Sequence, residues 1–314
     1  MKLVSRATRL FQYGFCVSLL LGTCAFVLAA DEQGKIFEAP GATIYFEIVG
    51  SGTGTPLLIV NGGPGAAHDY MHRTSAWDAI AKSRQVVFYD QRGTGRSLGD
   101  HKGQTFKLKE QIEDIDALRA HLGFDHMDIL GHSWGGMLAT AYAAAHPDRV
   151  SHFIYVDSGS PKGVKDTIFL FDNIYPDVQE RSDSLAFAVG MGDEKAEIKD
   201  QRNYFSMLFY SSEKRDAFLA SIPANVSFFN KEIQKAVWSD FEQFDLMPEV
   251  RKFRFPVIVI TGRFDINVAP LVAYRIHQAI PNSEFKVFEH SGHLPFYEEP
   301  QSFVAVLEQF LARQ

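Results

Sequence analysis

Most of what the sequence says about the fold lies in one segment, Met127-Asp128-Ile129-Leu130-Gly131-His132-Ser133-Trp134-Gly135. Its first four residues are typical of a buried strand, and the alanine-rich stretch over residues 135–145 is typical of a helix. A serine between two glycines at such a junction occupies a sharp strand-to-helix turn, which strains its backbone and exposes its hydroxyl. We therefore expect Ser133 to be a nucleophile rather than part of an ordinary structural turn.

Apolar runs and amphipathic stretches alternate on both sides of this turn. We expect strands at residues 43–49, 56–60, 85–89, 127–130, 150–156, 257–261 and 284–288, and helices at 107–122, 135–145, 269–279 and 301–312. This alternation predicts an α/β protein with a mostly parallel sheet and helices on both faces. Ligands should bind at the carboxyl ends of the strands.

Residues 161–250 interrupt the alternation. They lack the runs typical of strands and carry 14 aromatic residues, including Phe205, Phe209, Phe228 and Phe229. We expect a helical cap over the catalytic edge of a core formed by residues 35–160 and 251–314. The alternative is a surface excursion without a role in recognition.

A serine nucleophile needs a base to take its proton and an acid to orient that base. In the chain order serine, acid, histidine, both partners should follow later strands of the sheet. Asp265 lies just beyond the strand at 257–261, and His293 follows the strand at 284–288, in a loop bounded by Gly292 and Pro295. We expect Ser133, His293 and Asp265 to form a catalytic triad.

Other residues are open to the same roles. His290 is the alternative base, although it lies nearer the strand end, and Asp157 is the alternative acid because it follows the strand at 150–156. His132, beside the nucleophile, is expected to pack or to line the substrate pocket.

The oxyanion of an acyl-transfer reaction needs preorganised N–H donors. One should be the backbone N–H of Trp134, directly after the nucleophile. The loop Asn61-Gly62-Gly63-Pro64-Gly65, after the strand at 56–60, has the backbone freedom to supply the second. We favour Gly63 as that donor, with Gly62 as its substrate-binding neighbour; the alternative is an ordinary tight turn.

Residues 1–30 have the composition of a secretory signal peptide. Lys2, Arg6 and Arg9 precede an apolar stretch that ends in small residues. The stretch is too short to favour a permanent membrane anchor, and Cys24 offers only a weak lipoprotein pattern. Both cysteines lie in this segment. If the segment is removed on export, the mature periplasmic or secreted protein holds no disulfide.

Composition excludes some classes of function. The chain of 314 residues is 46% hydrophobic and 22% charged, as expected of a globular protein. Its formal charge of −7 becomes −10 when the three basic residues of the first 30 are removed, so nucleic acid is not an expected partner. His68 and His72 have a metal-compatible spacing, but no third ligand is evident, and neither a metal nor another cofactor is expected.

Three motifs together resemble those of the proline iminopeptidases, which are serine peptidases of the α/β-hydrolase fold. They are Asn61-Gly62-Gly63-Pro64-Gly65, Asp90-Gln91-Arg92-Gly93-Thr94-Gly95-Arg96-Ser97 and Gly131-His132-Ser133-Trp134-Gly135-Gly136. Gly262-Arg263-Phe264-Asp265 and Gly292-His293 match the places of that family's acid and base. The resemblance implies an α/β-hydrolase fold with a cap, and a structural role for Asp90 and Arg92 beneath the site.

The chain also departs from that family. Asn61 replaces the usual histidine, and the Trp-Glu pair that helps such enzymes bind the substrate's α-amino group does not occur. Asn225 lies in a stretch that corresponds to the position of another such glutamate. A desolvated ammonium needs a carboxylate partner, and the cap offers Glu213, Glu232, Asp240 and Glu242; Glu213 and Glu232 are our candidates.

These patterns predict an exported serine hydrolase that works through an acyl-enzyme. The resemblance favours an exopeptidase or amino-acid amidase that releases a small N-terminal residue from a small peptide or amide. A carboxylesterase or lactonase could use the same triad without an amine anchor. A binding module that has lost catalysis is the third alternative.

Overall fold

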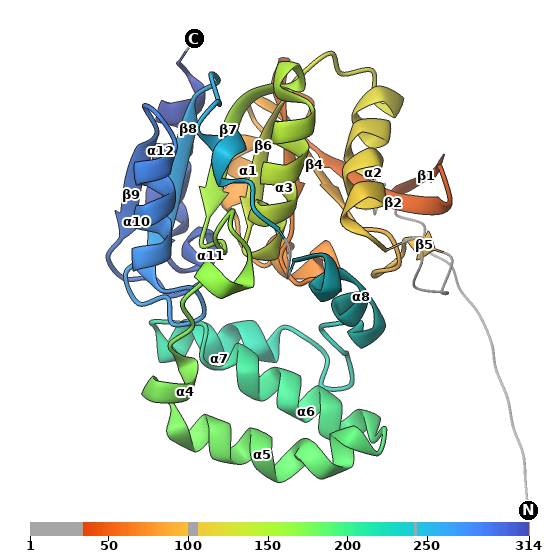
Figure 1. Cartoon of the computed structure of the whole chain (residues 1–314), viewed down its shortest axis with the longest axis vertical. Helices are drawn as coiled ribbons and strands as arrows, with labels where there is room; N and C mark the ends of the chain where they lie inside the picture. The colour runs from red at the N-terminus through yellow and green to blue at the C-terminus, as the bar shows by residue number, and fades with distance from the viewer. Residues whose placement is uncertain (1–33, 100–105, 242–243, 314) are drawn as a thin grey trace, which may run out of the picture. The chain divides into compact units, whose positions relative to one another are not determined.

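One mixed sheet organises the core of the protein (Figure 1). The computed structural model describes residues 34–99, 106–241 and 244–313. The strand order is β1 (Lys35–Ala39), β2 (Ala42–Val49), β4 (Arg84–Tyr89), β3 (Gly54–Val60), β6 (Met127–His132), β7 (Val150–Val156), β8 (Val257–Gly262) and β9 (Glu284–Phe288), with β5 (Leu98–Gly99) beside β2. Pairs from β4 onward are parallel, whereas β2 runs antiparallel to β1, β4 and β5.

The central strands are buried on both faces, which explains their unbroken apolar character. Every residue of β6 and β8 is buried. Successive side chains point to opposite faces, so Ile129 packs into one hydrophobic cluster and Leu130 into the other.

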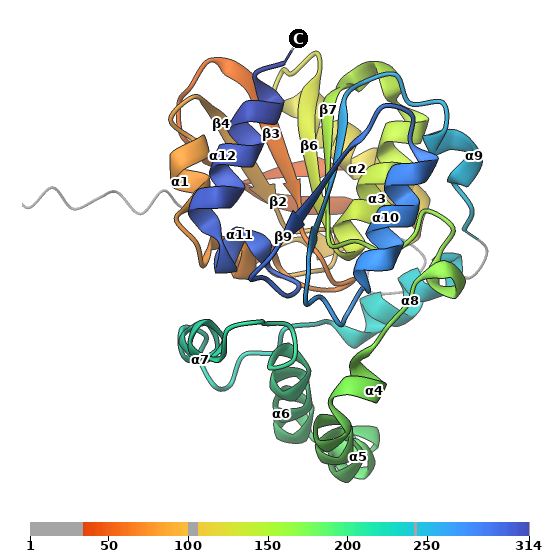
Figure 2. The same cartoon turned by 90° about the vertical axis from the view of Figure 1, so that its left-hand side faces the viewer.

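Helices cover both faces of the sheet (Figure 2). The cluster that contains Ile129 also holds side chains of α2 (Leu108–His121), α3 (Trp134–Ala145) and α10 (Pro270–Ala279). The cluster that contains Leu130 holds side chains of α1 (Ala76–Ile80) and α12 (Pro300–Leu311). This arrangement confirms the predicted α/β class with helices on both faces.

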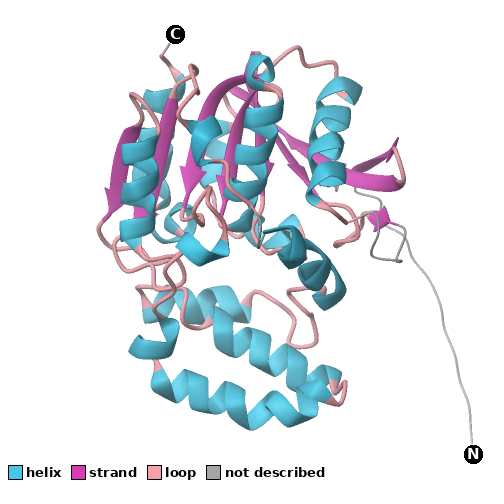
Figure 3. Ribbon diagram, viewed as in Figure 1, coloured by secondary structure: helices cyan, strands magenta, loops and turns pink. Residues whose placement is uncertain are grey.

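Between β7 and β8 the described chain is helical, without a strand of the sheet (Figure 3). The helices are α4 (Phe171–Ile174), α5 (Pro176–Gly190), α6 (Glu194–Phe205), α7 (Ser212–Ala220), α8 (Lys231–Phe241) and α9 (Met247–Val250). We call residues 161–250 the cap. Backbone hydrogen bonds join it to loops at the carboxyl ends of the strands: Asn230 N–H donates to the Gly65 carbonyl, and His293 N–H donates to the Leu208 carbonyl, each at 2.8 Å.

The predicted elements occur close to their expected positions, and the strands at 150–156 and 284–288 have the predicted bounds. Strand β1, strand β5 and helix α1 were not predicted. The proposed signal peptide lies outside the described residues. Among the described residues, no helix combines the length and the apolar character that a membrane span requires.

Candidate active site

Ser133 occupies the strand-to-helix turn between β6 and α3. Its backbone φ of 55° lies in the left-handed region, which is strained for a residue with a side chain. The turn is held on both sides, because Ser133 N–H donates to the Val156 carbonyl at 3.0 Å and Ser158 Oγ donates to the Ser133 carbonyl.

Glycines make this turn possible. A Cβ on Gly135 would lie 2.0 Å from the Val60 carbonyl oxygen, and one on Gly131 would lie 2.4 Å from Gly136 Cα. Both distances are far inside van der Waals contact, so the Gly-x-Ser-x-Gly pattern is required by the close approach of β3, β6 and α3.

The predicted base and acid are paired. His293 Nδ1 lies 2.8 Å from Asp265 Oδ2, and both residues are almost fully buried. The other oxygen of Asp265 accepts the backbone N–H groups of Asn267 at 2.8 Å and Val268 at 3.0 Å. With Asp265 held in this way, His293 carries its proton on Nδ1 and leaves Nε2 able to accept one.

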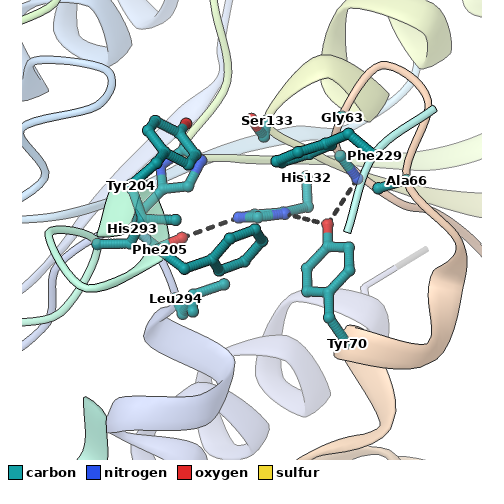
Figure 4. A pocket seen from close by; sticks show the side chains of 12 residues that line it. Gly63, Ala66, Tyr70, His132, Ser133, Tyr204, Phe205, Phe229, His293 and Leu294 are labelled. Atoms are coloured by element: carbon teal, nitrogen blue, oxygen red, sulfur yellow. Dashed lines mark hydrogen bonds between the residues drawn. The ribbon is translucent and has the colours of Figure 1, made fainter. Parts of the chain in front are cut away.

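Ser133 and His293 line the same small pocket (Figure 4). Gly62 and Gly63 contribute to its wall from the loop after β3, and the cap contributes aromatic side chains. The full lining is Gly62, Gly63, Ala66, Tyr70, His132, Ser133, Tyr204, Phe205, Leu208, Phe229, His293 and Leu294. The structure therefore brings the sequence-predicted nucleophile, base and glycine loop to one place at the carboxyl edge of the sheet.

A hydrogen-bond network connects the glycine loop to the base (Figure 4). Gly62 N–H donates to Tyr70 Oη at 2.6 Å, Tyr70 Oη lies 2.7 Å from His132 Nδ1, and His132 Nε2 lies 2.8 Å from the His293 carbonyl. Burial raises the pKa of Tyr70 and, with the nearby His293, holds the pKa of His132 well below its usual range. A neutral His132 donates through Nε2 and accepts from Tyr70, so its role is to hold the loop and the base together.

The backbone N–H groups of Gly62 and Gly63 differ in whether they are already used. The Gly62 N–H is already used by Tyr70, whereas no hydrogen bond among the described residues uses the Gly63 N–H. Gly63 has a φ of 142°, which favours glycine. Of the two, Gly63 is thus the one with a donor still available to an oxyanion.

The alternative base, His290, lies outside the pocket. Its side chain is 69% exposed, and its nearest carboxylate partner is Glu299 at 3.9 Å.

The alternative acid, Asp157, lies close to the candidate triad. Asp157 is buried with a φ of 42°, accepts the Gly262 N–H at 2.8 Å, and has a carboxylate oxygen within 4.8 Å of ligand atoms of Asp265 and His293.

The candidate amine anchors do not reach the pocket. Glu213 lies in the first turn of α7 and Glu232 in the first turn of α8, and both are exposed. The pocket lining contains no aspartate or glutamate. Nothing in the described pocket therefore provides the carboxylate that a buried ammonium group would need.

His68 and His72, which have a metal-compatible spacing, lie close to a third possible ligand, Glu47, that the sequence did not reveal. In Glu47 of β2, Oε1 lies 3.6 Å from His68 Nε2 and Oε2 lies 3.5 Å from His72 Nε2. The Arg96 guanidinium lies 3.3 Å from His68 Nε2 and 3.8 Å from Glu47. A cation would have to compete with Arg96 for these atoms.

The charges around His68 are also balanced by the protein itself. Burial alone would lower the pKa of His68, but the hydrogen bond to Asp90 and the nearby Glu47 carboxylate raise it to about 9. The close contact with His68 in turn lowers the pKa of Glu47 to about 2. A charged His68 between two carboxylates stabilises the loop beneath the site, which agrees with the structural role expected for Asp90.

Sequence reasoning missed three residues that contact this machinery: Tyr70, Tyr204 and Asn267. Tyr70 lies within the His68–His72 segment (η1), which drew attention only for its histidines. Asn267 lies two residues beyond Asp265, and a check of polar residues just after the acid would have found it. Tyr204 is one of many cap aromatics, and its contact becomes visible only in three dimensions.

Comparison with known proteins agrees with this fold. Residues 55–300 match the family described as the alpha/beta hydrolase fold. The chain therefore belongs to the α/β-hydrolase family. Within it, the chain is similar to proline iminopeptidases: it is 31% identical to that of Clostridium botulinum, over 85% of this chain and 94% of the relative, and 31% identical to that of Clostridioides difficile, over 86% and 95%.

Solved structures show the same fold at lower identity. An alpha/beta fold family hydrolase from Bacillus anthracis superposes with a TM-score of 0.71 at 22% identity, covering 88% of this chain and 98% of the other. An enol-lactonase from Burkholderia xenovorans superposes with a TM-score of 0.70 at 21% identity, covering 89% and 100%.

Proposed function

We propose that this protein is a serine hydrolase that works through an acyl-enzyme. The observation that carries the proposal is the shared pocket of Ser133 and His293, with His293 paired to Asp265. Ser133 Oγ attacks the acyl carbon while its proton passes to His293 Nε2. The backbone N–H groups of Gly63 and Trp134 stabilise the resulting oxyanion.

The same groups complete the cycle. Collapse of the tetrahedral intermediate breaks the bond to the leaving group, which takes the proton from His293 Nε2. Water then attacks the acyl-serine and gives its proton to His293, and the second intermediate releases the acid and restores Ser133 Oγ–H. Asp265 stabilises the imidazolium that forms in each half.

For the substrate, we propose a small peptide or amino-acid amide from which an N-terminal residue is released. The support is the similarity to proline iminopeptidases over most of the chain. The pocket's cavity volume is only about 30 Å³, so cap side chains must move to admit a substrate.

An ester or lactone is the second candidate substrate. The pocket wall lacks a carboxylate, and an ester substrate needs no ammonium anchor. The two candidates differ in a measurable way, because only an aminopeptidase depends on a free α-amino group.

The first test is labelling of the protein by a fluorophosphonate probe, with the modified peptide identified by mass spectrometry. Wild-type protein should label at Ser133, whereas Ser133→Ala should not label and should lose turnover by roughly 10⁴-fold or more. His293→Ala should lose as much, and the matched His290→Ala should retain near-normal activity. Loss of labelling in His290→Ala but not in His293→Ala would contradict the assignment, and an unlabelled wild type would favour the binding module.

The second test compares prolyl- and alanyl-arylamides with short-chain aryl esters, each with and without an acylated amine where one exists. An aminopeptidase should lose turnover of the arylamides when the amine is acylated. Ester turnover that exceeds arylamide turnover by orders of magnitude, with no effect of acylation, would instead establish the esterase.

Export is a separate proposal, supported by the composition of residues 1–30. Expression of the full chain in a Gram-negative host should yield a periplasmic or secreted product that begins near residue 31, as N-terminal mass spectrometry would show. An uncleaved cytosolic product would contradict it.

A further inference from the structure

The base of the candidate triad is engaged by a neighbour other than the nucleophile. His293 Nε2 lies 3.2 Å from Asn267 Nδ2. Among the described residues, no hydrogen bond joins His293 to Ser133, although both line the same pocket. The atom that must accept the serine proton is therefore already in contact with an amide.

The proton positions in this contact follow from its neighbours. His293 Nδ1 donates to Asp265, so Nε2 of the neutral ring is an acceptor and Asn267 must present its NH₂ group. The amide oxygen of Asn267 then faces Tyr204 Oη at 2.7 Å, and Tyr204 must donate. Burial, with the nearby Asp265 charge, raises the pKa of Tyr204, so the phenol keeps the proton that it donates.

This chain of hydrogen bonds connects the cap to the base. Tyr204 belongs to α6, whereas Asn267 follows β8 and is 6% exposed. The backbone N–H of Asn267 also donates to Asp265 Oδ1 at 2.8 Å, which fixes Asn267 relative to the acid. Tyr204 lines the pocket, so a substrate that enters must contact the residue that orients the amide.

We propose that Asn267 is a positioning residue that holds the neutral His293 ring in a resting state, and that Tyr204 keeps the Asn267 amide in the holding orientation. Nε2 has one lone pair, so it cannot accept from Asn267 and from Ser133 at once. A substrate that displaces Tyr204 allows the amide to turn and releases the base to Ser133. The inference rests on the proposed serine mechanism, because it concerns when His293 Nε2 is free to accept the Ser133 proton.

The test measures how fast Ser133 reacts with a fluorophosphonate in the absence of substrate, across pH. Asn267→Ala should label about 3- to 10-fold faster than wild type, because one neutral hydrogen bond to the base is removed. The other titratable groups around the ring, Asp157, Asp265 and His132, are unchanged.

A second variant removes a single oxygen. Tyr204→Phe should also label faster than wild type, but by a smaller factor than Asn267→Ala, because the Asn267 amide is then able to turn. The matched control is Tyr210→Phe, an exposed cap tyrosine outside the pocket, which should label as wild type does. Thermal unfolding identifies a variant that fails to fold; Asn267→Ser then replaces Asn267→Ala.

The outcomes are distinguishable. Asn267 and Tyr204 variants that label at the wild-type rate with an unchanged pH profile overturn the holding role and leave the serine mechanism intact. Slower labelling of Asn267→Ala also overturns it, because the amide would then assist the base. A wild-type protein that does not label at Ser133 overturns both proposals.

Discussion

At the scale of single residues, the acid is the point where sequence and structure differ most in what they can decide. Asp157 follows β7 and Asp265 follows β8, and these strands are parallel neighbours. Both carboxyl groups therefore reach the same edge of the sheet, beside His293. The sequence could name both candidates, but only the 2.8 Å contact to Nδ1 distinguishes Asp265.

Asp157 has a different character from Asp265. Burial and the neighbouring Asp265 charge raise the pKa of Asp157 well above its usual range. A protonated Asp157 adds no second negative charge to the site beside Asp265. Its role is then to support the acid, not to replace it.

Asp157→Asn tests this role. The folded state binds the Asp157 proton more tightly than the unfolded chain does. As pH rises above the pKa that Asp157 has in the unfolded chain, this group therefore lowers the free energy of unfolding progressively. We expect Asp157→Asn to be more stable than wild type at pH 7, by about 1 kcal/mol or more, and nearly equal at pH 4. Urea unfolding at both pH values measures the difference.

Kinetics complete this test. Turnover of Asp157→Asn should stay within about tenfold of wild type, whereas Asp265→Asn should lose on the order of 10⁴-fold. A strongly destabilised Asp157→Asn at pH 7, or an equal loss of turnover in both variants, would show that Asp157 acts as a charged acid.

At the scale of elements, regular periodicity made the fold predictable. The strand, turn and helix around Ser133 follow from their apolar pattern and from glycines that the packing requires. Strand β1 was missed because two of its five residues are exposed charged side chains, Lys35 and Glu38. The contact of Glu47 with His68 was missed because it depends on how β2 pairs with β4, which no local pattern gives.

Gly135→Ala should show how tightly the turn is packed. Its Cβ would lie 2.0 Å from the Val60 backbone, which side-chain movement cannot relieve. We expect a loss of more than about 3 kcal/mol of stability, or no soluble protein. Thermal and chemical unfolding, with expression yield, measure the effect.

The matched control is Gly190→Ala at the end of α5, where a Cβ meets nothing within 4 Å. There alanine should gain up to about 1 kcal/mol through helix propensity. Equal effects of the two substitutions would show that the turn has more room than the structure indicates.

At the scale of the whole molecule, one carboxylate joins the cap to the loop that carries the base. Glu298 Oε1 accepts the N–H groups of Tyr210 and Ser211 at 2.9 Å each, and Oε2 accepts Gly292 N–H at 2.6 Å. Glu298 is 1% exposed and lies in α11 (Pro295–Glu298). No local sequence pattern reveals these contacts, because the partners lie 6 to 88 residues away.

Glu298→Gln should weaken this junction. A glutamine keeps one acceptor oxygen but turns an NH₂ group toward a backbone donor, so we expect a loss of about 1–3 kcal/mol and a fall in kcat. Urea unfolding and steady-state kinetics measure these effects. The control Glu289→Gln removes the charge that pairs with Arg263 on the surface and should leave stability close to that of wild type. A similar change in both variants would contradict the role of Glu298.

The left-handed backbone of Ser133 has a consequence for heat resistance. Such a conformation costs about 1–3 kcal/mol when the residue carries a side chain, and glycine adopts it with little strain. The inactive Ser133→Gly protein should therefore melt at a higher temperature than the native chain. At this position the side chain that the proposed reaction needs also lowers thermal stability. Selection for a more heat-stable protein would therefore have to act on other residues.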